Sequence, residues 1–334
     1  GGGVRGGQVI GTTDAGGNCV NACMAYARQI AADAIVAVGG GSVMDAAKAV
    51  KYGLAHQILD INESLQAGIY MESWPAAQHT GIPHLAVPTT AGTGAEVSAA
   101  AVFFDEDNDL KKGLVVPFLE ADIAVLDAQL TVGLPPGLTA STGMDALTHA
   151  LEGVASPAAN PFTDSHCILA AQLIEQNLPE AVHNGGNIDA RDRMLTASCM
   201  AIDGYVASLN ATPVHNCAHA FGALFHIPHG DANGVFLPIV MEALPDLYIP
   251  NAERLATALN MPVGDRSGAD LVTDVVAKLR DFQQAINCAT DLGRWNVSAD
   301  RMEEIVMAVA TDPLGVFFPI PPEKIQEITL KAIG

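Results

Sequence analysis

Residues 34–52 read AIVAVGGGSVMDAAKAVKY, and this stretch decides the fold expected for the N-terminal part of the chain. A short apolar run over residues 34–38 stops at three glycines, and residues 43–52 then follow a helical pattern. Short apolar runs that end in glycine and lead directly into a helix are typical of a strand–turn–helix unit in a parallel sheet. We therefore predict a strand, a glycine turn and a helix in this stretch.

The same alternation continues on both sides of it. A helix is predicted over residues 18–31, and further strands over residues 84–87, 100–104, 114–116 and 123–126. After LPPG at residues 134–137 the apolar runs lengthen to helical spacing, the longest being residues 143–154, 163–177, 189–209 and 269–282. The predicted fold is thus an α/β domain with a largely parallel sheet over residues 1–134, followed by an all-helical domain over residues 135–334.

Composition limits the classes of function. The 334 residues include 16 Lys+Arg and 37 Asp+Glu, a net charge of −21, which repels nucleic acid and anionic membrane surfaces. The most apolar twenty residues, 85–104, contain a proline, three threonines and a glutamate, so no membrane span is predicted. Six cysteines without a CxxC pair or a signal peptide indicate reduced thiols and a cytoplasmic protein.

Two glycine- and hydroxyl-rich segments follow predicted strands. Residues 39–42, GGGS, stand between a strand and a helix, where backbone N–H groups and the helix N-terminus favour an anion such as a phosphate. Residues 88–96, PTTAGTGAE, follow a second strand, at the sheet edge where open α/β sheets bind ligands. The alternative for each is an ordinary turn or loop of the same composition.

Histidines and one aspartate form helical pairs in the second half. Asp145 and His149 are four residues apart, as are His215 and His219, and His226 and His229 follow closely. Pairs at i and i+4 share one face of a helix, as metal ligands often do, although surface contacts and hydrogen-bonded core histidines show the same spacing. A carboxylate in such apolar surroundings needs compensation, which favours a metal site with one carboxylate and several imidazoles.

Four motifs occur in the order and spacing of one known family. GGGSVMDAAKA (39–49), PTTAGTGAEVS (88–98), GMDALTHALE (143–152) and HNCAHAFGALFHIPHG (215–230) resemble those of the iron-containing (group III) alcohol dehydrogenases. The resemblance extends over nearly the whole chain and implies a Rossmann-like dinucleotide-binding domain followed by a helical metal-binding domain. The strand–helix section that opens most members is expected to be absent before residue 18.

The resemblance also implies roles for particular residues. The metal ligands fall on Asp145, His149, His215 and His229, and His219 is the histidine that transfers a proton beside the nicotinamide. The cofactor pyrophosphate falls on Gly40, Gly41 and Ser42, the adenosine and ribose on Thr89, Thr90 and Thr93, and the nicotinamide-side ribose on Lys111. His226 matches no functional position and is interpreted as structural.

The implied activity is that of a metal-dependent oxidoreductase. It transfers a hydride between NAD or NADP and a small alcohol, aldehyde or diol, with Fe²⁺ as the expected ion and Zn²⁺ as the alternative. A homodimer or larger homo-oligomer is expected. Two alternatives stay open: a relative on the same scaffold, such as a glycerol dehydrogenase or a phosphate-eliminating cyclase, and a truncated homologue that binds metal without catalysis. The Asp145 ligand and the small number of basic residues weigh against the cyclase.

Overall fold

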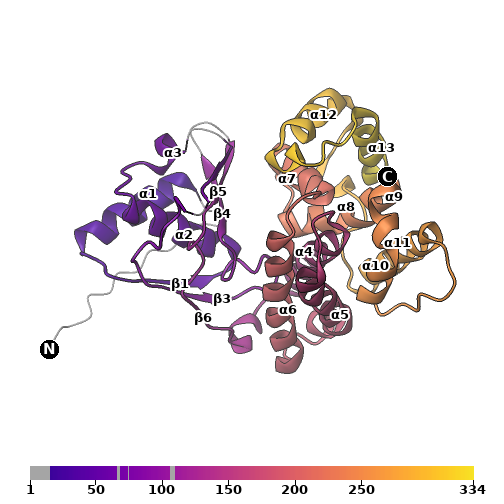
Figure 1. Cartoon of the computed structure of the whole chain (residues 1–334), viewed down its shortest axis with the longest axis horizontal. Coiled ribbons are helices and arrows are strands. Elements are labelled where there is room, and N and C mark those ends of the chain that lie inside the picture. The colour runs from indigo at the N-terminus through magenta and orange to yellow at the C-terminus, as the bar shows by residue number, and fades with distance from the viewer. Residues whose placement is uncertain (1–15, 66–67, 74, 106–109) are drawn as a thin grey trace. The chain divides into compact units, whose positions relative to one another are not determined.

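The computed structural model describes residues 16–65, 68–73, 75–105 and 110–334, without the side chains of residues 64, 110 and 111 (Figure 1). The chain divides into two compact units. The first consists of Gly1–Thr90 and Ala95–Leu130, and the second of Ala91–Gly94 and Thr131–Gly334.

The first unit contains a parallel sheet of the predicted kind. Strand β1 (Ile35–Gly39) pairs with β3 (His84–Pro88), which pairs in turn with β6 (Ile123–Ala124). Helix α2 (Gly41–Ala55) begins directly after the glycine turn and packs on β1 and β3, and α1 (Gly17–Gln29) packs on α2. Small side chains, Ala37 on β1 and Ala86 on β3, are buried under Met44 of α2. The α/β fold predicted for this part is confirmed.

A second sheet differs from the prediction. Strand β5 (Leu110–Val115) runs parallel to β2 (Ile69–Met71) and antiparallel to β4 (Ala100–Asp105). Because β4 and β5 follow one another with only a short connection, they pair as neighbouring antiparallel strands instead of joining the parallel sheet. The sequence did not predict β2, since three residues are too few to show an alternation of apolar and polar positions. A four-residue helix, α3 (Ile61–Ser64), precedes β2.

Helix α2 is attached to β4 by buried charges. The Lys48 ammonium, which is fully buried, lies 3.0 Å from Asp45 Oδ1 and 3.1 Å from Ser98 Oγ. The backbone N–H of Val102 donates to the other Asp45 oxygen at 3.1 Å. Asp45 therefore joins the helix to the second sheet.

The second unit is helical, and residues 131–334 contain no strand. Its first five long helices are α4 (Pro136–Ala155), α5 (Pro161–His183), α6 (Ile188–Ala207), α7 (Pro213–Phe225) and α8 (His229–Ala243). The later helices are α9 (Pro245–Tyr248), α10 (Ala252–Ala258), α11 (Gly268–Ala285), α12 (Met302–Thr311) and α13 (Pro322–Ile333). Single turns of 3-10 helix are η1 (Ala128–Thr131), η2 (Ile249–Asn251), η3 (Gly293–Trp295), η4 (Ala299–Arg301) and η5 (Pro313–Val316).

Helix α4 is the centre of this unit. It packs against α5, α6 and α8 (Figure 1). Every residue from Gly143 to Ala155 is buried. Proline at the first position of α4, α5 and α7 suits a helix start, where the missing N–H costs nothing. His226 ends α7 with a φ of 54°, so its role in the fold is to turn the chain toward α8.

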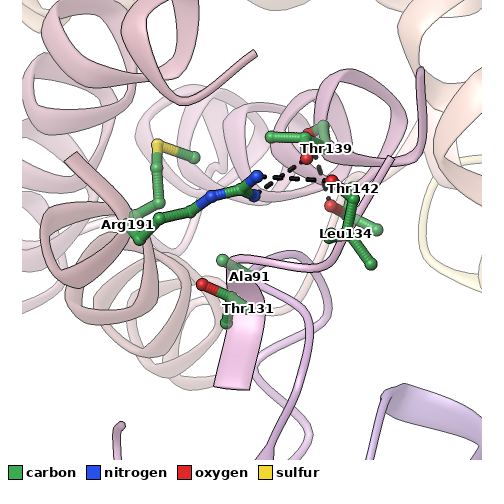
Figure 2. Close-up of a pocket in the computed structure, with 7 residues that line it drawn as sticks. Ala91, Thr131, Leu134, Thr139, Thr142 and Arg191 are labelled. Carbon is green, nitrogen blue, oxygen red and sulfur yellow. Dashed lines mark hydrogen bonds between the residues drawn. The ribbon is translucent and has the colours of Figure 1, made fainter. Parts of the chain in front are cut away.

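A buried arginine secures the segment that leads into α4. Figure 2 shows a pocket of the helical unit in which the Arg191 guanidinium of α6 donates to Thr139 Oγ1 at 2.8 Å and to the Leu134 carbonyl at 3.3 Å. The pocket is also lined by Ala91, Thr131, Thr142 and Met194. These bonds fix the position of the first turn of α4 relative to α6.

The predictions about membrane spans and about the cysteines both concern residues that the structure describes. None of the helices there is, taken singly, long and apolar enough to cross a membrane; the pair His229–Ala243 and Pro245–Ala258, bent by 92°, meets the length and composition criteria only together. All six cysteines are described, and each is a free thiol.

Candidate metal centre

Three helices of the second unit bring the predicted ligands together. Asp145 and His149 lie on α4, His215 on α7 and His229 at the first position of α8. Helix α8 packs against both α4 and α7, so residues far apart in the sequence share one site. The pairs at i and i+4 do share one helix face each, as their spacing predicts.

Asp145, His215 and His229 form a compact cluster of ligand atoms. His215 Nε2 lies 3.6 Å and His229 Nε2 3.4 Å from Asp145 Oδ1, and one ligand atom from each of the three lies within 4.8 Å of the others. Donor atoms that bind one ion at about 2.1 Å are roughly 3–3.5 Å apart. The three residues are thus spaced as ligands of a single divalent ion.

His149, the fourth predicted ligand, lies beside this cluster. Its ring is stacked on that of His215, with centroids 4.5 Å apart and an interplanar angle of 22°. The Tyr205 ring also meets the His149 ring edge-on, with centroids 4.9 Å apart. The structure therefore groups three of the four predicted ligands and places His149 in contact with one of them.

The buried charges at the site shift several pKa values. Burial alone would raise the pKa of Asp145, but the nearby His149, His229 and His215 rings outweigh it and hold the pKa well below its usual range. Burial lowers the pKa of His149 to about 3, so this ring is neutral. At His215 burial also disfavours the charged form, yet the neighbouring Asp145 carboxylate and a hydrogen bond to Glu152 raise the pKa to about 9.

Unpartnered buried atoms are a second sign of a binding site. Within the described part of the chain, His215 Nε2 and His149 Nδ1 are buried and have no hydrogen-bond partner. Buried ring nitrogens are normally hydrogen-bonded, because an unpaired polar group in the interior is costly. A cation that accepts the His215 Nε2 lone pair would remove that cost, so the residues present fit a divalent ion.

Two buried polar residues support the cluster and were not predicted. The Asn233 side-chain amide on α8 donates to Asp145 Oδ1 at 2.8 Å and lies 3.2 Å from His229 Nε2. Glu152 on α4 accepts from His215. Both could have been found by helical spacing, since Asn233 is four residues after His229, and Glu152 is seven after Asp145.

His219 lies on the same face of α7 as His215, one turn further along. Its ring centroid is 5.2 Å from that of His229, and its Nδ1 lies 3.7 Å from the carboxylate of Asp312. About a quarter of the His219 side chain is exposed, whereas that of His215 is almost completely buried. The ring therefore lies between the ligand cluster and the surface of the helical unit.

The residues predicted to bind the cofactor divide between the two units. Gly40, Gly41 and Ser42 form the start of α2, and Thr89 and Thr90 follow the adjacent strand β3, with the Thr89 N–H donating to the Gly39 carbonyl at 2.8 Å. A Cβ on Gly40 would come within 3.3 Å of the Thr90 side chain, so glycine keeps this turn open. The first N–H groups of a helix have no acceptor within the helix, which makes the turn suitable for a phosphate.

Thr93 and Lys111 stand apart from that group. Thr93 belongs to the helical unit, and its hydroxyl lies 3.5 Å from Asp145 Oδ2. Lys111 lies on β5 and its backbone pairs with Phe104 of β4, but its side chain lies outside the described residues. The structure thus brings Thr93 to the ligand cluster and leaves the Lys111 prediction as a prediction.

Family models match most of the chain. The model described as iron-containing alcohol dehydrogenase matches residues 11–128, and that described as the C-terminal part of the Fe-containing alcohol dehydrogenase family matches residues 139–333. The protein named "Probable alcohol dehydrogenase EutG" from Salmonella typhimurium is 40% identical over 261 residues, which cover 78% of this chain and 64% of that relative. The match spans less than two thirds of that relative's length.

Solved structures show the same similarity. A 1,3-propanediol oxidoreductase has a TM-score of 0.85 at 31% identity, with 96% of this chain and 82% of that one covered. The sulfoacetaldehyde reductase from Bifidobacterium kashiwanohense, solved in complex with NAD⁺, has a TM-score of 0.78 at 26% identity, with 97% and 81% covered. Because the C-terminal family model alone covers more than half of the chain, the chain belongs to the iron-containing alcohol dehydrogenase family.

Proposed function

We propose that this protein is a metal-dependent oxidoreductase that transfers a hydride between a nicotinamide cofactor and a small alcohol or aldehyde. The observation that carries the proposal is the cluster of Asp145, His215 and His229, in which the buried His215 Nε2 has no hydrogen-bond partner. Family membership supports the activity, as do the names of the relatives, which are an alcohol dehydrogenase, a diol oxidoreductase and an aldehyde reductase.

In this proposal Asp145, His215 and His229 would hold a divalent ion, and His149, whose ring is stacked on His215, is the expected fourth ligand. When bound, the ion supplies polarisation of an alcohol or carbonyl oxygen, and the nicotinamide supplies the hydride acceptor or donor. The donor set of imidazoles with one carboxylate suits Fe²⁺ and Zn²⁺ alike, with Fe²⁺ expected from the family. Asn233 and Glu152 orient the ligands.

His219 takes up the proton that an alcohol loses. Imidazole titrates near neutral pH, and Asp312 stabilises the charged ring from the side of Nδ1. Partial exposure of His219 lets the proton pass on to solvent.

The glycine turn of the first unit binds the cofactor pyrophosphate. Gly40, Gly41 and Ser42 present the start of α2 to it, and Thr89 and Thr90 border the same turn. Lys111 is assigned to the cofactor ribose by family resemblance. We propose NAD or NADP as the cofactor, the former being present in one related structure.

Assembly and compartment belong to the same proposal. A homo-oligomer, most simply a dimer, is the expected state, and light scattering of the purified protein measures it. The free thiols of all six cysteines support a reducing compartment such as the cytoplasm.

The proposal is tested by turnover of the metal-loaded protein. Protein loaded with Fe²⁺ without oxygen, or with Zn²⁺, is mixed with NAD⁺ or NADP⁺ and a panel of primary alcohols and diols, and the absorbance of the reduced nicotinamide is followed. We expect turnover with at least one pair and its loss in His215→Ala. His226→Asn is the matched control, because His226 is an exposed histidine outside the cluster and asparagine tolerates its positive φ.

Two results would contradict the proposal. One is the absence of cofactor reduction with every alcohol and diol although metal and cofactor both bind. The other is turnover of a phosphorylated sugar acid without net cofactor reduction, which would indicate a phosphate-eliminating cyclase.

A further inference from the structure

Glu152 is a carboxylate buried in the helical unit, and both of its oxygens are engaged. It lies on α4 and is 1% exposed. Oε1 accepts from the Val214 backbone N–H at 2.7 Å, and Oε2 lies 2.5 Å from His215 Nδ1. Among the described residues, His215 is the one side chain that forms an ion pair with it. A buried carboxylate whose one ion-pair partner is an imidazole requires an explanation beyond packing.

The two bonds of Glu152 act on consecutive residues of α7. Its bond to the Val214 N–H fixes where the carboxylate stands relative to the first turn of the helix. Its other oxygen then faces the imidazole of the next residue. An ionised carboxylate only accepts hydrogen bonds, so His215 Nδ1 must carry the proton. The remaining nitrogen, Nε2, is the one that lies 3.6 Å from Asp145 Oδ1.

The neighbouring rings restrict the same imidazole. His149 is stacked on one side of His215 at 4.5 Å between ring centroids, and Tyr205 lies against it at 5.0 Å. These rings limit the plane of the imidazole but do not distinguish its two nitrogens. That distinction comes from Glu152.

We propose that Glu152 is a positioning residue of the metal centre, which holds the His215 ring with Nδ1 protonated and turned outward, so that Nε2 is presented to the ion. This inference rests on the proposed function, since it concerns how the chain prepares one ligand for a divalent ion. Asp145 and Glu152 are seven residues apart on the same face of α4, so a single helix supplies both the carboxylate ligand and the group that orients an imidazole ligand. Partners of this kind set the tautomer and basicity of a metal-bound histidine.

A purely structural role must be separated from this one. The side chain of Thr212, at the N-cap position of α7, accepts no bond from the first turn, and Glu152 accepts the Val214 N–H in its place. Loss of Glu152 would therefore weaken α7 even without any ion. The informative variant is Glu152→Gln, whose carbonyl can still accept from Val214 while its NH₂ group then faces His215 Nδ1. An amide N–H there requires Nδ1 to accept, which moves the ring proton to Nε2 and blocks that nitrogen as a ligand.

The experiment compares metal binding by wild type, Glu152→Gln and Asp164→Asn. Asp164 is a carboxylate of the same unit that is paired with Arg254 at 2.5 Å and does not touch the cluster, so its replacement reports loss of stability alone. Zn²⁺ affinity is measured by competition with a chromophoric chelator, and the ligand field by the visible spectrum of the Co²⁺-loaded protein. We expect Glu152→Gln to weaken Zn²⁺ binding by about 10- to 100-fold and to shift the Co²⁺ bands. Asp164→Asn should keep the wild-type affinity and spectrum.

The outcomes distinguish this inference from the proposed function. If wild type binds Zn²⁺ and Co²⁺ but Glu152→Gln matches it in affinity and spectrum, Glu152 does not position His215, and the proposed function is untouched. The same conclusion follows if the variant only melts at a lower temperature. If wild type itself binds neither ion, the proposed function fails, and the role of Glu152 at the metal centre fails with it.

Discussion

At the scale of single residues, charge in the core of the helical unit is concentrated around His215. Asp145 and Glu152 are both almost completely buried and lie on either side of its ring. Two carboxylates place two formal negative charges in the interior around this ring, and Asp145 also lies 3.4 Å from His229 Nε2. A divalent cation with neutral imidazoles would make the group electrically neutral, so the buried charges of this unit favour binding of a doubly charged ion.

Another buried histidine, His84 of β3, predicts a pH dependence of stability in the first unit. It is 3% exposed, and burial together with the Lys51 and Lys48 charges lowers its pKa to about 4. In the unfolded chain histidine binds a proton near pH 6.5. Between about pH 6.5 and 4 the unfolded state therefore binds more protons, and the free energy of unfolding decreases as the pH is lowered, by up to about 3 kcal/mol.

The free energy of unfolding is measured in urea between pH 7 and pH 4.5. Unfolding of the first unit is monitored by hydrogen exchange in the peptides that contain β3. His84→Gln removes the titrating group and should flatten the pH dependence relative to wild type. His226→Asn, which removes a surface histidine of the other unit, should keep the wild-type slope. Equal slopes for wild type and His84→Gln would show that His84 does not contribute.

At the scale of elements, the ligand cluster depends on how closely α8 approaches α4. A Cβ on Gly230, the residue after His229, would lie 2.2 Å from the Ser141 carbonyl oxygen of α4. Gly230→Ala should therefore push the start of α8 away from α4. We expect the free energy of unfolding to fall by about 1–3 kcal/mol and Zn²⁺ affinity to fall with it.

Gly137 in the first turn of α4 is the matched control for Gly230. A Cβ there would have no neighbour within 4 Å. Gly137→Ala should stabilise the helix by up to about 1 kcal/mol and leave Zn²⁺ affinity unchanged. Thermal unfolding and chelator competition measure both effects, and equal behaviour of the two variants would contradict the role assigned to the close approach.

In the first unit, the contact between α2 and β4 depends on the buried pair of Lys48 and Asp45. Lys48→Met leaves the Asp45 carboxylate without its cation, and we expect a loss of about 3–5 kcal/mol in unfolding free energy. Lys48→Met combined with Asp45→Asn should lose less than the sum of the single variants. A double-mutant cycle by urea unfolding measures this coupling, and additive losses would mean that the two charges do not interact.

At the scale of the whole molecule, the two units have different parts in the proposed activity: the first would bind the cofactor and the second the metal ion. The glycine turn belongs to the first, and the ligand cluster to the second. Zn²⁺ at about a hundred times its dissociation constant should stabilise the helical unit by about 2.7 kcal/mol. Hydrogen exchange should then slow in α4, α7 and α8, whereas NAD⁺ should slow it in the peptides that contain residues 39–42 and 88–90.

Removal of the ion provides the control for this experiment. A chelator should reverse the protection of α4, α7 and α8 and leave the first unit unaffected. Protection by Zn²⁺ at the glycine turn instead of at the three helices would contradict the assignment of metal and cofactor to separate units.

Local patterns were sufficient for much of this molecule. The strand–turn–helix at residues 34–52 and the strands that correspond to β3 and β6 were predicted, because short apolar runs and glycines depend on the local backbone conformation. The i, i+4 pairs identified Asp145 and His215 as site residues. The antiparallel pairing of β4 and β5 was not predicted, because each strand alone shows the same short apolar run as a strand of the parallel sheet.

The sequence by itself determined many of the helices and strands, and which polar side chains share one helix face, since both depend on neighbours within about one or two turns. Only the tertiary structure decided that α4, α7 and α8 meet, that His149 lies against His215 outside the ligand cluster, and that Thr93 reaches Asp145. It also showed that Glu152 contacts His215 and that Asn233 contacts Asp145 and His229. Most of these contacts join segments more than 50 residues apart in the sequence. Their distances are set by packing between distant elements, which no local pattern encodes.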